Sequence, residues 1–478
     1  MKSKYCIHPL PGHDREKVYP IKAKTVLTFV LLIACVSLEA RQPSDRKPNI
    51  LVILADDLGY HDLSYYGTPD IRTPNIDMLC KAGMRFDNFY SNSPVCSPTR
   101  ASLMSGRYPE MVGVPGLIRS NPDANFGFLK PDALLLPKLL KQADYNTALV
   151  GKWNLGLETP NTPNEKGFDF FHGFLDDMMN DYWDHLRNGK DFMRKNDRQD
   201  NPKGRHATDV FTGWAIDYIA EQKNNANPFF LYLAYNAPHF PVQPPEEWMA
   251  KVKARQPNST ETRAKLVALI EHMDDGIGKV IKALKETGAY DNTLIVFMSD
   301  NGGFLPDNAN NGALRDGKGS MYEGGIRVPA FCVWSNHIQP AAVSLQPALT
   351  MDIYPTLAEV AGITIRHKVD GISLLNVLLG KVKNLPERPL FFTRREGNLK
   401  FGGETIQAVI NGDWKLLQNS PFEPYQLYNL HEDPKEERNL VSAELEQYKK
   451  LQLMLISQLQ KGGSIPWQRP EKQNQEER

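Results

Sequence analysis

The chain has 478 residues, of which 41% are hydrophobic and 23% are charged, a composition typical of a folded globular protein and not of a disordered or membrane-embedded chain. Its 56 lysines and arginines balance its 56 aspartates and glutamates, which excludes a general basic field for nucleic-acid binding, so any affinity for anions must be local. Because this chain is longer than the size at which one hydrophobic core usually suffices, we expect one large domain and one smaller domain.

An apolar run at Thr25–Leu38 follows several lysines near the N-terminus. It is typical of a signal peptide and too short to cross a bilayer. We therefore expect residues 1–40 to be a signal peptide that directs export to the periplasm, the cell surface or the medium. The segment Leu32-Ile33-Ala34-Cys35 resembles a bacterial lipobox, in which Cys35 would carry a lipid anchor, and ordinary cleavage near Ala40 is the alternative.

Three cysteines follow Cys35, namely Cys80, Cys96 and Cys332. An odd number argues against a framework of disulfides. Cys80 and Cys332 have apolar neighbours and are expected to be core residues.

From Pro48 onward, short apolar runs alternate with helical stretches, which predicts an α/β fold with a large sheet flanked by helices. Four runs are predicted as core strands, and each ends at polar residues: 49–55, 147–150, 229–234 and 293–298. Ligands of such sheets bind beyond the carboxyl ends of the strands, so these polar residues predict one shared site. The stretches 212–221 and 264–287 have helical periodicity, and the polar stretch 184–205 is expected to be a surface insertion.

The sequence changes character after Arg366. Short strands are predicted at 391–393, 407–410, 414–417 and 426–430, followed by a helix at 443–459. This pattern predicts a small antiparallel sheet with one helix. We therefore expect a large domain over residues 46–370, a C-terminal subdomain over 385–462 and a disordered tail over 463–478.

Two strand ends carry oxygen ligands. Asp56 and Asp57 follow the first run, and Asp300 and Asn301 follow the last. Either pair alone is expected more often in a turn or a helix cap. Together they have the composition that a hard divalent cation requires, with Ca²⁺ as the first choice and Mg²⁺ as the alternative.

Four other side chains could meet at this site and bring positive charge: Arg100, Lys152, His239 and Lys318. Each alone is expected at the surface. Together they suit a tetrahedral anionic group whose oxygens need positive charge and whose leaving alcohol needs a proton donor. Lys318 lies in a glycine-rich run at 315–319, where the backbone can approach an anion.

The run Cys96-Ser97-Pro98-Thr99-Arg100, continuing to Gly106-Arg107, resembles the signature of formylglycine-dependent type I sulfatases, arylsulfatase-like members of the alkaline phosphatase superfamily. Further segments similar to this family lie at 55–60, 73–77, 151–153, 237–239, 299–303, 322–329, 413–416 and 433–440. The resemblance covers residues 48–440 and favours a bacterial polysaccharide sulfatase.

The resemblance implies an alkaline-phosphatase-like fold in which a separate maturation enzyme oxidises Cys96 to formylglycine. One hydroxyl of the hydrated aldehyde would attack sulfur and form a covalent sulfo-enzyme. The second hydroxyl would lose its proton and expel sulfate, which restores the aldehyde. A serine could not do so, because it lacks the second hydroxyl.

The resemblance also implies a role for each matching residue. The cation would be held by Asp56, Asp57, Asp300, Asn301 and the modified residue at Cys96. Arg100 would hold the hydrate, and Lys152 would contact the hydrate and the sulfate. Lys318 and His239 would grip the sulfate and protonate the leaving alcohol.

The sequence departs from the family pattern at Asn154, where a histidine usually follows Gly-Lys-Trp. That histidine is expected to help deprotonate the hydrate, and asparagine cannot act as a base. Asn154 could still orient the hydrate. His61 is a candidate replacement for the base, and a surface histidine near a turn is the alternative.

The predicted function is hydrolysis of sulfate esters on a sulfated polysaccharide or oligosaccharide. A phosphomonoester or phosphonate hydrolase of the same superfamily is the main alternative, although the sequence shows no second cluster of His and Asp ligands of the kind such phosphatases use. A non-catalytic glycan-binding lipoprotein is a second alternative.

Overall fold

The computed structural model describes residues 46–397 and 404–468. The predicted signal peptide, Cys35 and the end of the predicted tail beyond Gln468 lie outside these residues. From Lys47 onward, the described residues belong to one compact unit. None of the helices in these two ranges is both long enough and apolar enough to cross a membrane.

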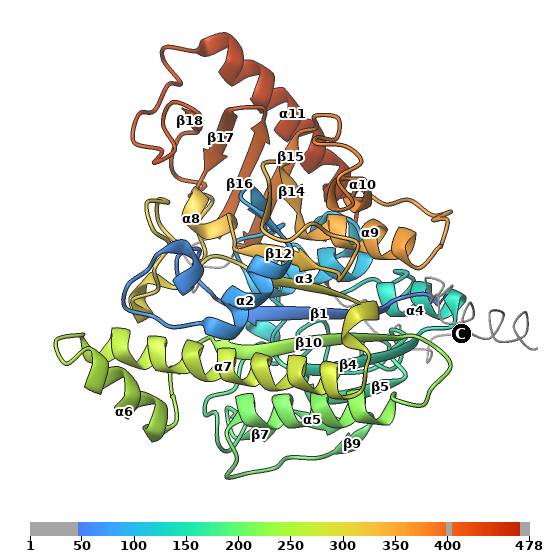
Figure 1. Ribbon diagram of the computed structural model, residues 1–478. Coiled ribbons are helices and arrows are strands. Elements are labelled where there is room, and N and C mark those ends of the chain that lie inside the picture. Colours follow the sequence, from blue (N-terminus) through green and yellow to red (C-terminus); the bar gives the residue numbers. More distant parts are fainter. Residues whose placement is uncertain (1–45, 398–403, 469–478) are drawn as a thin grey trace, which may run out of the picture. The chain divides into compact units, whose positions relative to one another are not determined.

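A ten-stranded mixed sheet forms the centre of this unit (Figure 1). Its strand order is β13-β2-β12-β11-β1-β10-β4-β5-β8-β9. In chain order the strands are β1 (Asn49–Asp56), β2 (Met84–Phe86), β4 (Asn146–Lys152), β5 (Phe170–Phe174), β8 (Met193–Lys195), β9 (Arg198–Gln199), β10 (Phe229–Pro238), β11 (Thr293–Ser299), β12 (Ala330–Val333) and β13 (Ala342–Ser344). The central strands from β11 through β1, β10 and β4 to β5 are parallel. These include all four predicted core strands.

The two faces of β1 explain its uninterrupted apolar run. Ile50 and Val52 point into one hydrophobic core, and Leu51 and Ile53 point into the other. A parallel strand covered on both faces needs apolar residues at every position. The predicted α/β class is therefore confirmed.

Helices cover both faces of the sheet (Figure 1). The first core contains residues of α3 (Cys96–Ser105), α4 (Leu136–Leu140), α9 (Ile353–Val360) and α10 (Leu375–Leu378). The second contains residues of α2 (Pro74–Ala82), α5 (Ala207–Glu221), α6 (Glu246–Arg255) and α7 (Glu261–Glu286). The two predicted helices are thus α5 and α7, and both pack on the same face.

One glycine sets the end of β4. The backbone at Gly151 has φ +105°, and a Cβ there would lie 2.0 Å from the carbonyl oxygen of Ala234 in β10. Only glycine permits so close an approach of the two strands. Lys152, the next residue, is therefore held at the carboxyl edge of the sheet.

The polar stretch 184–205 contributes more than the predicted surface insertion. It forms a small hairpin from β6 (Leu186–Arg187) and β7 (Lys190–Asp191), followed by β8 and β9. Because β8 pairs with β5, this stretch extends the central sheet at one edge.

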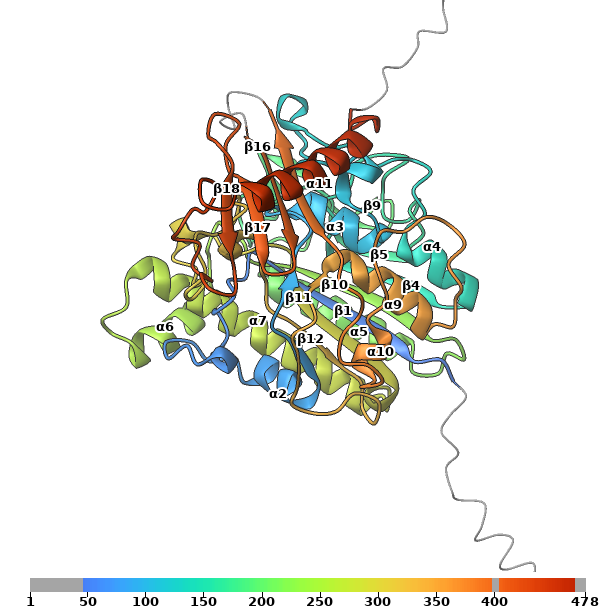
Figure 2. The same cartoon turned by 90° about the horizontal axis from the view of Figure 1, so that it is seen from above.

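The C-terminal part forms the predicted antiparallel sheet with one helix. Its strands are β15 (Leu390–Glu396), β16 (Glu404–Asn411), β17 (Trp414–Gln418) and β18 (Gln426–Asn429). Helix α11 (Leu445–Gly463) crosses one face of this sheet (Figure 2), where Leu451 and Leu455 pack on Val409 and Leu416.

The opposite face of the small sheet packs against residues that precede it in the chain. Phe392 and Ala408 share a hydrophobic cluster with Met321 and Tyr322. These two residues lie just before and at the start of the short helix α8 (Glu323–Ile326). A separate two-stranded pairing of β3 (Phe89–Tyr90) with β14 (Ala348–Leu349) lies in the same region. The C-terminal sheet therefore supports the segment that carries Lys318.

Candidate active site

Several of the predicted site residues lie at the carboxyl ends of neighbouring parallel strands. Asp56 ends β1, Lys152 ends β4, and His239 directly follows β10. Asp300 and Asn301 directly follow β11. Because these strands are adjacent and parallel, their side chains meet at one edge of the sheet.

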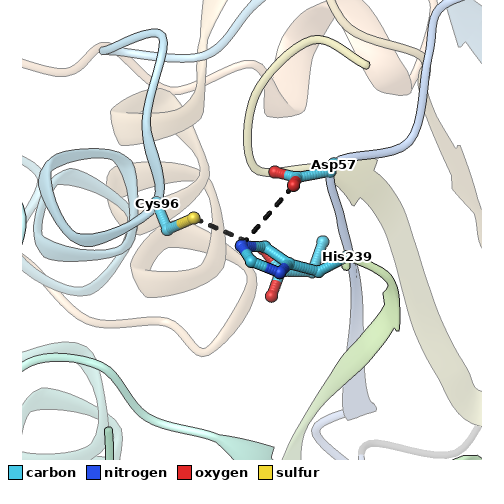
Figure 3. A group of neighbouring side chains, drawn as sticks. Asp57, Cys96 and His239 are labelled. Atoms are coloured by element: carbon cyan, nitrogen blue, oxygen red, sulfur yellow. Dashed lines mark hydrogen bonds and ion pairs between the residues drawn. The ribbon is translucent and has the colours of Figure 1, made fainter. Parts of the chain in front are cut away.

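Cys96 occupies the first position of α3 and is 2% exposed. Its Sγ lies 3.4 Å from Asp56 Oδ1 and 3.8 Å from Lys318 Nζ. In Figure 3 the side chains of Asp57, Cys96 and His239 point toward one another. Ligand atoms of Asp56, Asp57, Cys96 and His239 all lie within 4.8 Å of each other. The structure therefore brings Cys96 together with the predicted acidic residues.

The thiol of Cys96 is a poor nucleophile in this setting. Burial raises the pKa of Cys96 well above its ordinary value, and the nearby Lys152 and Lys318 do not reverse this effect. A protonated thiol neither attacks an ester nor binds a cation strongly. If residue 96 reacts, it is expected to do so in another chemical form.

Arg100 and Asp300 form a fully buried ion pair. The Nη2 atom of Arg100 lies 2.7 Å from Asp300 Oδ2 and 3.3 Å from Asp56 Oδ1. Arg100 lies one turn after Cys96 on α3, so this pair fixes the start of the helix against the ends of β1 and β11.

Each of the two lysines at the site pairs with one aspartate. Lys152 Nζ lies 2.6 Å from Asp56 Oδ2, and Lys318 Nζ lies 2.7 Å from Asp57 Oδ2. Burial alone would lower the pKa of each lysine, but the paired carboxylate outweighs burial and raises it. Both lysines are therefore positively charged at neutral pH.

The two aspartates are in turn held ionised. Burial alone would raise their pKa values. For Asp56 this effect is outweighed by Lys152, His239 and Arg100, and for Asp57 by His239 and Lys318, so both pKa values lie below the ordinary range. Ionised carboxylates are the form that binds a cation.

His239 has one ring nitrogen committed to the backbone. Its Nδ1 lies 2.7 Å from the carbonyl oxygen of Phe240, which can only accept, so Nδ1 carries a proton. Nε2 lies 3.6 Å from Asp57 Oδ2. Burial lowers the pKa of His239, which favours a neutral ring with a lone pair on Nε2.

The oxygen atoms at this edge fit a hard divalent cation. Asn301 Nδ2 donates to Asp57 Oδ1 at 2.7 Å, whereas its Oδ1 is buried and has no hydrogen-bond partner among the described residues. A buried amide oxygen without a partner costs free energy unless a ligand satisfies it. With Asp56, Asp57 and Asp300 it completes an all-oxygen set of the kind that Ca²⁺ or Mg²⁺ prefers.

Asn154 is engaged in a different structural task. Ser97 Oγ donates to Asn154 Oδ1 at 2.8 Å, and Asn154 Nδ2 donates to the carbonyl oxygen of Ile118 at 2.9 Å. The backbone N–H of Ile118 donates to Ser97 Oγ at 3.0 Å, which closes a ring of three hydrogen bonds. Asn154 thus ties the residue after Cys96 to a neighbouring loop.

His61 packs among aromatic rings. Its ring lies 5.7 Å from that of Tyr60 and 5.8 Å from that of Tyr66. Its backbone bonds to Asn310 and Thr68. These contacts place His61 with the tyrosines, and none of them joins it to Cys96.

Sequence reasoning missed Tyr182. Its hydroxyl donates to the carbonyl oxygens of Asn236 and His239, at 2.7 Å and 2.9 Å. It thereby fixes the backbone that presents the His239 ring. The surrounding sequence carries no motif, so only the structure identifies this residue.

Comparisons with known proteins point in one direction. Residues 48–363 match a family model described as Sulfatase, and residues 316–463 match the model of the C-terminal region of N-sulphoglucosamine sulphohydrolase. Human N-acetylgalactosamine-6-sulfatase is 33% identical, over 77% of this chain and 71% of its own. A sulfatase from Formosa agariphila is 30% identical, over 88% of this chain and 90% of its own. The solved structure of Ps i-CgsB in complex with k-i-k-neocarrahexaose has 33% identity and a TM-score of 0.81, and it covers 89% of this chain and 96% of its own.

Proposed function

Since this chain belongs to the sulfatase family and is a sulfuric ester hydrolase, we propose that it cleaves sulfate esters of a glycan through an oxidised Cys96 and one divalent cation. The observation that carries this proposal is the position of Cys96. It lies at the N-terminus of α3, within 4.8 Å of the ligand atoms of two aspartates and His239. In its thiol form it has no evident use there, whereas an oxygen nucleophile would meet both cationic and acidic partners.

Formylglycine at position 96 would supply, as its hydrate, one hydroxyl to attack sulfur and a second whose deprotonation releases sulfate. A cation held by Asp56, Asp57, Asp300 and Asn301 would withdraw charge from the sulfate and make the attacking hydroxyl more acidic. The N-terminus of α3 adds a partial positive charge at the same place.

The remaining residues bind the sulfate and move protons. Lys152 pairs with Asp56 and Lys318 pairs with Asp57, so two positive charges lie beside Cys96. These two lysines would hold the sulfate oxygens. His239 presents Nε2 to the same space, so in its protonated form it would donate to the leaving alcohol.

His239 also supports an answer to the missing histidine. Asn154 is held by Ser97 and Ile118, whereas the neutral His239 ring has its Nε2 lone pair directed toward Cys96 and Asp57. After donating its proton to the alcohol, His239 would regain this lone pair and could accept a proton from the second hydroxyl.

A sulfated glycan is the proposed substrate class. One relative is named for action on N-acetylgalactosamine 6-sulfate, and a similar solved structure contains an oligosaccharide, k-i-k-neocarrahexaose. A panel of defined sulfated oligosaccharides tests this proposal. Activity on aryl sulfates alone, with none on any sulfated sugar, would contradict it.

Oxidation of Cys96 is tested by mass spectrometry of the tryptic peptide that ends at Arg100, from cells with and without a maturation enzyme. We expect the mass loss for replacement of –CH₂SH by –CHO, and only in the first sample. A fully active protein with an intact Cys96 thiol would contradict the mechanism.

The phosphatase alternative is tested by paired aryl esters. We expect sulfate release to exceed phosphate release and to fall when a chelator is added. Equal rates for both esters, or no effect of the chelator, would favour the alternative. Absence of hydrolysis together with glycan binding would favour the non-catalytic lipoprotein.

We further propose that the protein is exported, because the apolar run at residues 25–38 is typical of a signal peptide. Cell fractionation with palmitate labelling distinguishes the two predicted forms. Label that is lost in a Cys35→Ser variant indicates a lipid anchor, and unlabelled protein in the periplasm or medium indicates ordinary cleavage.

A further inference from the structure

A second cluster of metal-binding side chains lies on the helical face of the sheet, apart from Cys96. His206 is the N-cap of α5, Asp209 lies in the first turn of that helix, and His272 lies in the middle of α7. The two helices run side by side in Figure 1 and pack on the same face of the sheet. Ligand atoms of these three residues lie within 4.8 Å of one another.

Both histidines are buried, with exposures of 1% for His206 and 3% for His272, whereas Asp209 is exposed. His272 Nε2 lies 2.9 Å from Asp209 Oδ1, and the centres of the two imidazole rings are 4.8 Å apart. A small ion could therefore be held by protein on one side and reached by water on the other.

The hydrogen bonds of His206 suit a metal ligand. Its Nε2 lies 3.0 Å from the carbonyl oxygen of Gln243, which can only accept, so Nε2 carries the proton and Nδ1 carries the lone pair. Metal-binding histidines characteristically donate their other N–H to a backbone carbonyl in this way, which fixes the ring. The lone pair now accepts a long hydrogen bond of 3.2 Å from the Thr208 N–H, which a cation would replace.

His272 supplies a second, independent observation. Its Nδ1 is buried and has no hydrogen-bond partner among the described residues. A buried ring nitrogen without a partner costs free energy unless a ligand satisfies it. The ring packs against His206 and Trp248, and apart from the bond to Asp209 no hydrogen bond engages it in the described structure. A ring nitrogen of His272 is therefore available to an ion, with Asp209 as a neighbouring ligand or as the acceptor of the other N–H.

We propose that His206, His272 and Asp209 form a second metal site, which binds a borderline divalent transition metal such as Zn²⁺ and completes its coordination with water. Two imidazoles and one carboxylate suit Zn²⁺, whereas Ca²⁺ and Mg²⁺ prefer sites built of oxygen atoms. The two sites of the molecule therefore select different classes of cation.

The site is connected to the catalytic edge of the sheet. The His206 ring stacks on Tyr182 with centres 5.0 Å apart, and the side chain of Gln243 accepts from the Tyr182 N–H. Tyr182 in turn holds the backbone of His239. A cation at this site would fasten α5 to α7 and stiffen the support of His239.

The test is calorimetric titration of the full-length protein with Zn²⁺ in excess Ca²⁺, which occupies the oxygen-rich site. We expect about one Zn²⁺ per chain, at least about tenfold weaker binding in Asp209→Asn, and loss of binding in His272→Gln and His206→Gln, since each variant removes one of three ligands. His337→Gln is the matched control, because His337 is an exposed histidine stacked on Trp334 and should leave binding unchanged.

Circular dichroism confirms that the variants fold, and a thermal scan gives a second readout. Zn²⁺ should raise the unfolding temperature of the unaltered protein but not that of His272→Gln. Absence of Zn²⁺ binding by the unaltered protein, or unchanged binding in both histidine variants, overturns the proposal. Loss of binding in His239→Gln alone also overturns it, since that result would assign the Zn²⁺ to the catalytic edge. None of these outcomes depends on sulfate ester hydrolysis.

Discussion

Cys96 differs from Cys80 and Cys332 in its neighbouring side chains and not in its burial. Cys80, Cys96 and Cys332 are all buried, and burial raises the pKa of Cys80 and of Cys332 to about 12. Of the three cysteines that the structure describes, Cys96 alone has a carboxylate and a lysine against its sulfur. The chemistry of Cys96 is therefore set by Asp56 at the end of β1 and by Lys318 in its loop.

Replacement of Cys96 tests this directly. We expect Cys96→Ala to lower the rate of sulfate release by at least about a thousandfold, because the nucleophile cannot form. Cys332→Ala is the control, since it also removes a buried thiol but lies in β12. Comparable losses in both variants would show that packing, and not the nucleophile, explains the effect.

Asn154 allows a sharper test of the departure from the family pattern. We expect Asn154→His to reduce the free energy of unfolding by about 1–3 kcal/mol, because the imidazole cannot both accept from Ser97 and donate to Ile118 in the same geometry. We also expect no gain in sulfate release. Chemical denaturation and steady-state kinetics measure the two effects.

Asn336→His is the matched control for this change. Asn154 and Asn336 both have a positive φ, of 56° and 62°, but Asn336 is exposed. A faster enzyme in Asn154→His would show that the ring of hydrogen bonds is dispensable and that a base at this position helps elimination.

The convergence of the candidate site residues at one edge of the sheet could be predicted from the sequence, but some of their hydrogen-bond partners could not. Asp56, Lys152 and Asp300 follow strand-like apolar runs, so their meeting at one edge follows from parallel topology. The bonds of Asn154 to Ser97 and Ile118 depend on how a loop folds over α3. No local sequence pattern encodes these bonds. The hydrogen bond between Tyr182 and the His239 carbonyl oxygen is likewise not encoded by a local pattern.

At the scale of elements, α8 links the small C-terminal sheet to the site. Lys415 of β17 is fully buried, and its Nζ lies 2.9 Å from Glu323 and 2.8 Å from Glu436. Glu323 is the first residue of α8, and Gly324 follows it. The Gly324 carbonyl oxygen packs closely against Gly302, the residue after Asn301, since a Cβ at Gly302 would lie 1.8 Å from that oxygen. The small sheet therefore holds a ligand of the proposed cation in place.

We expect Lys415→Met to lower the free energy of unfolding by about 3–5 kcal/mol, because two buried carboxylates lose their partner. Urea denaturation measures this loss. Lys449→Met should change it by less than about 0.5 kcal/mol, since the Lys449–Glu446 pair is exposed. Equal effects of the two substitutions would contradict a structural role for the buried pair.

The elements themselves were predicted unevenly, for a physical reason. Strands β1 and β11 are buried on both faces and read as apolar runs. The edge strands β8 and β9 have only three and two residues, of which all but the buried Met193 are polar, and they pair with the sheet through backbone hydrogen bonds. Such pairing leaves little trace in side-chain chemistry, so the stretch 184–205 resembled an insertion.

At the scale of the whole molecule, the proposed cation should stabilise the fold. We expect EGTA to lower the unfolding temperature and added Ca²⁺ to restore it, by an amount equivalent to about 2.7 kcal/mol when Ca²⁺ is at a hundred times its Kd. A thermal scan measures the shift. Asp300→Asn should abolish the response, whereas the exposed Asp132→Asn should keep it. An unchanged unfolding temperature in EGTA would contradict a cation site at this edge.

The charges gathered at the catalytic edge have a thermodynamic consequence. Asp56, Asp57 and Asp300 offset Arg100, Lys152 and Lys318, so these six side chains sum to zero. A divalent cation among them leaves two positive charges in surplus, which an anion can compensate in a buried setting. Binding of the cation and of inorganic sulfate should therefore be positively coupled, and by linkage each should tighten the other by the same factor. The enzyme would thus bind its metal most tightly while its product is abundant. Product inhibition and metal retention would then both follow from the net charge of this site.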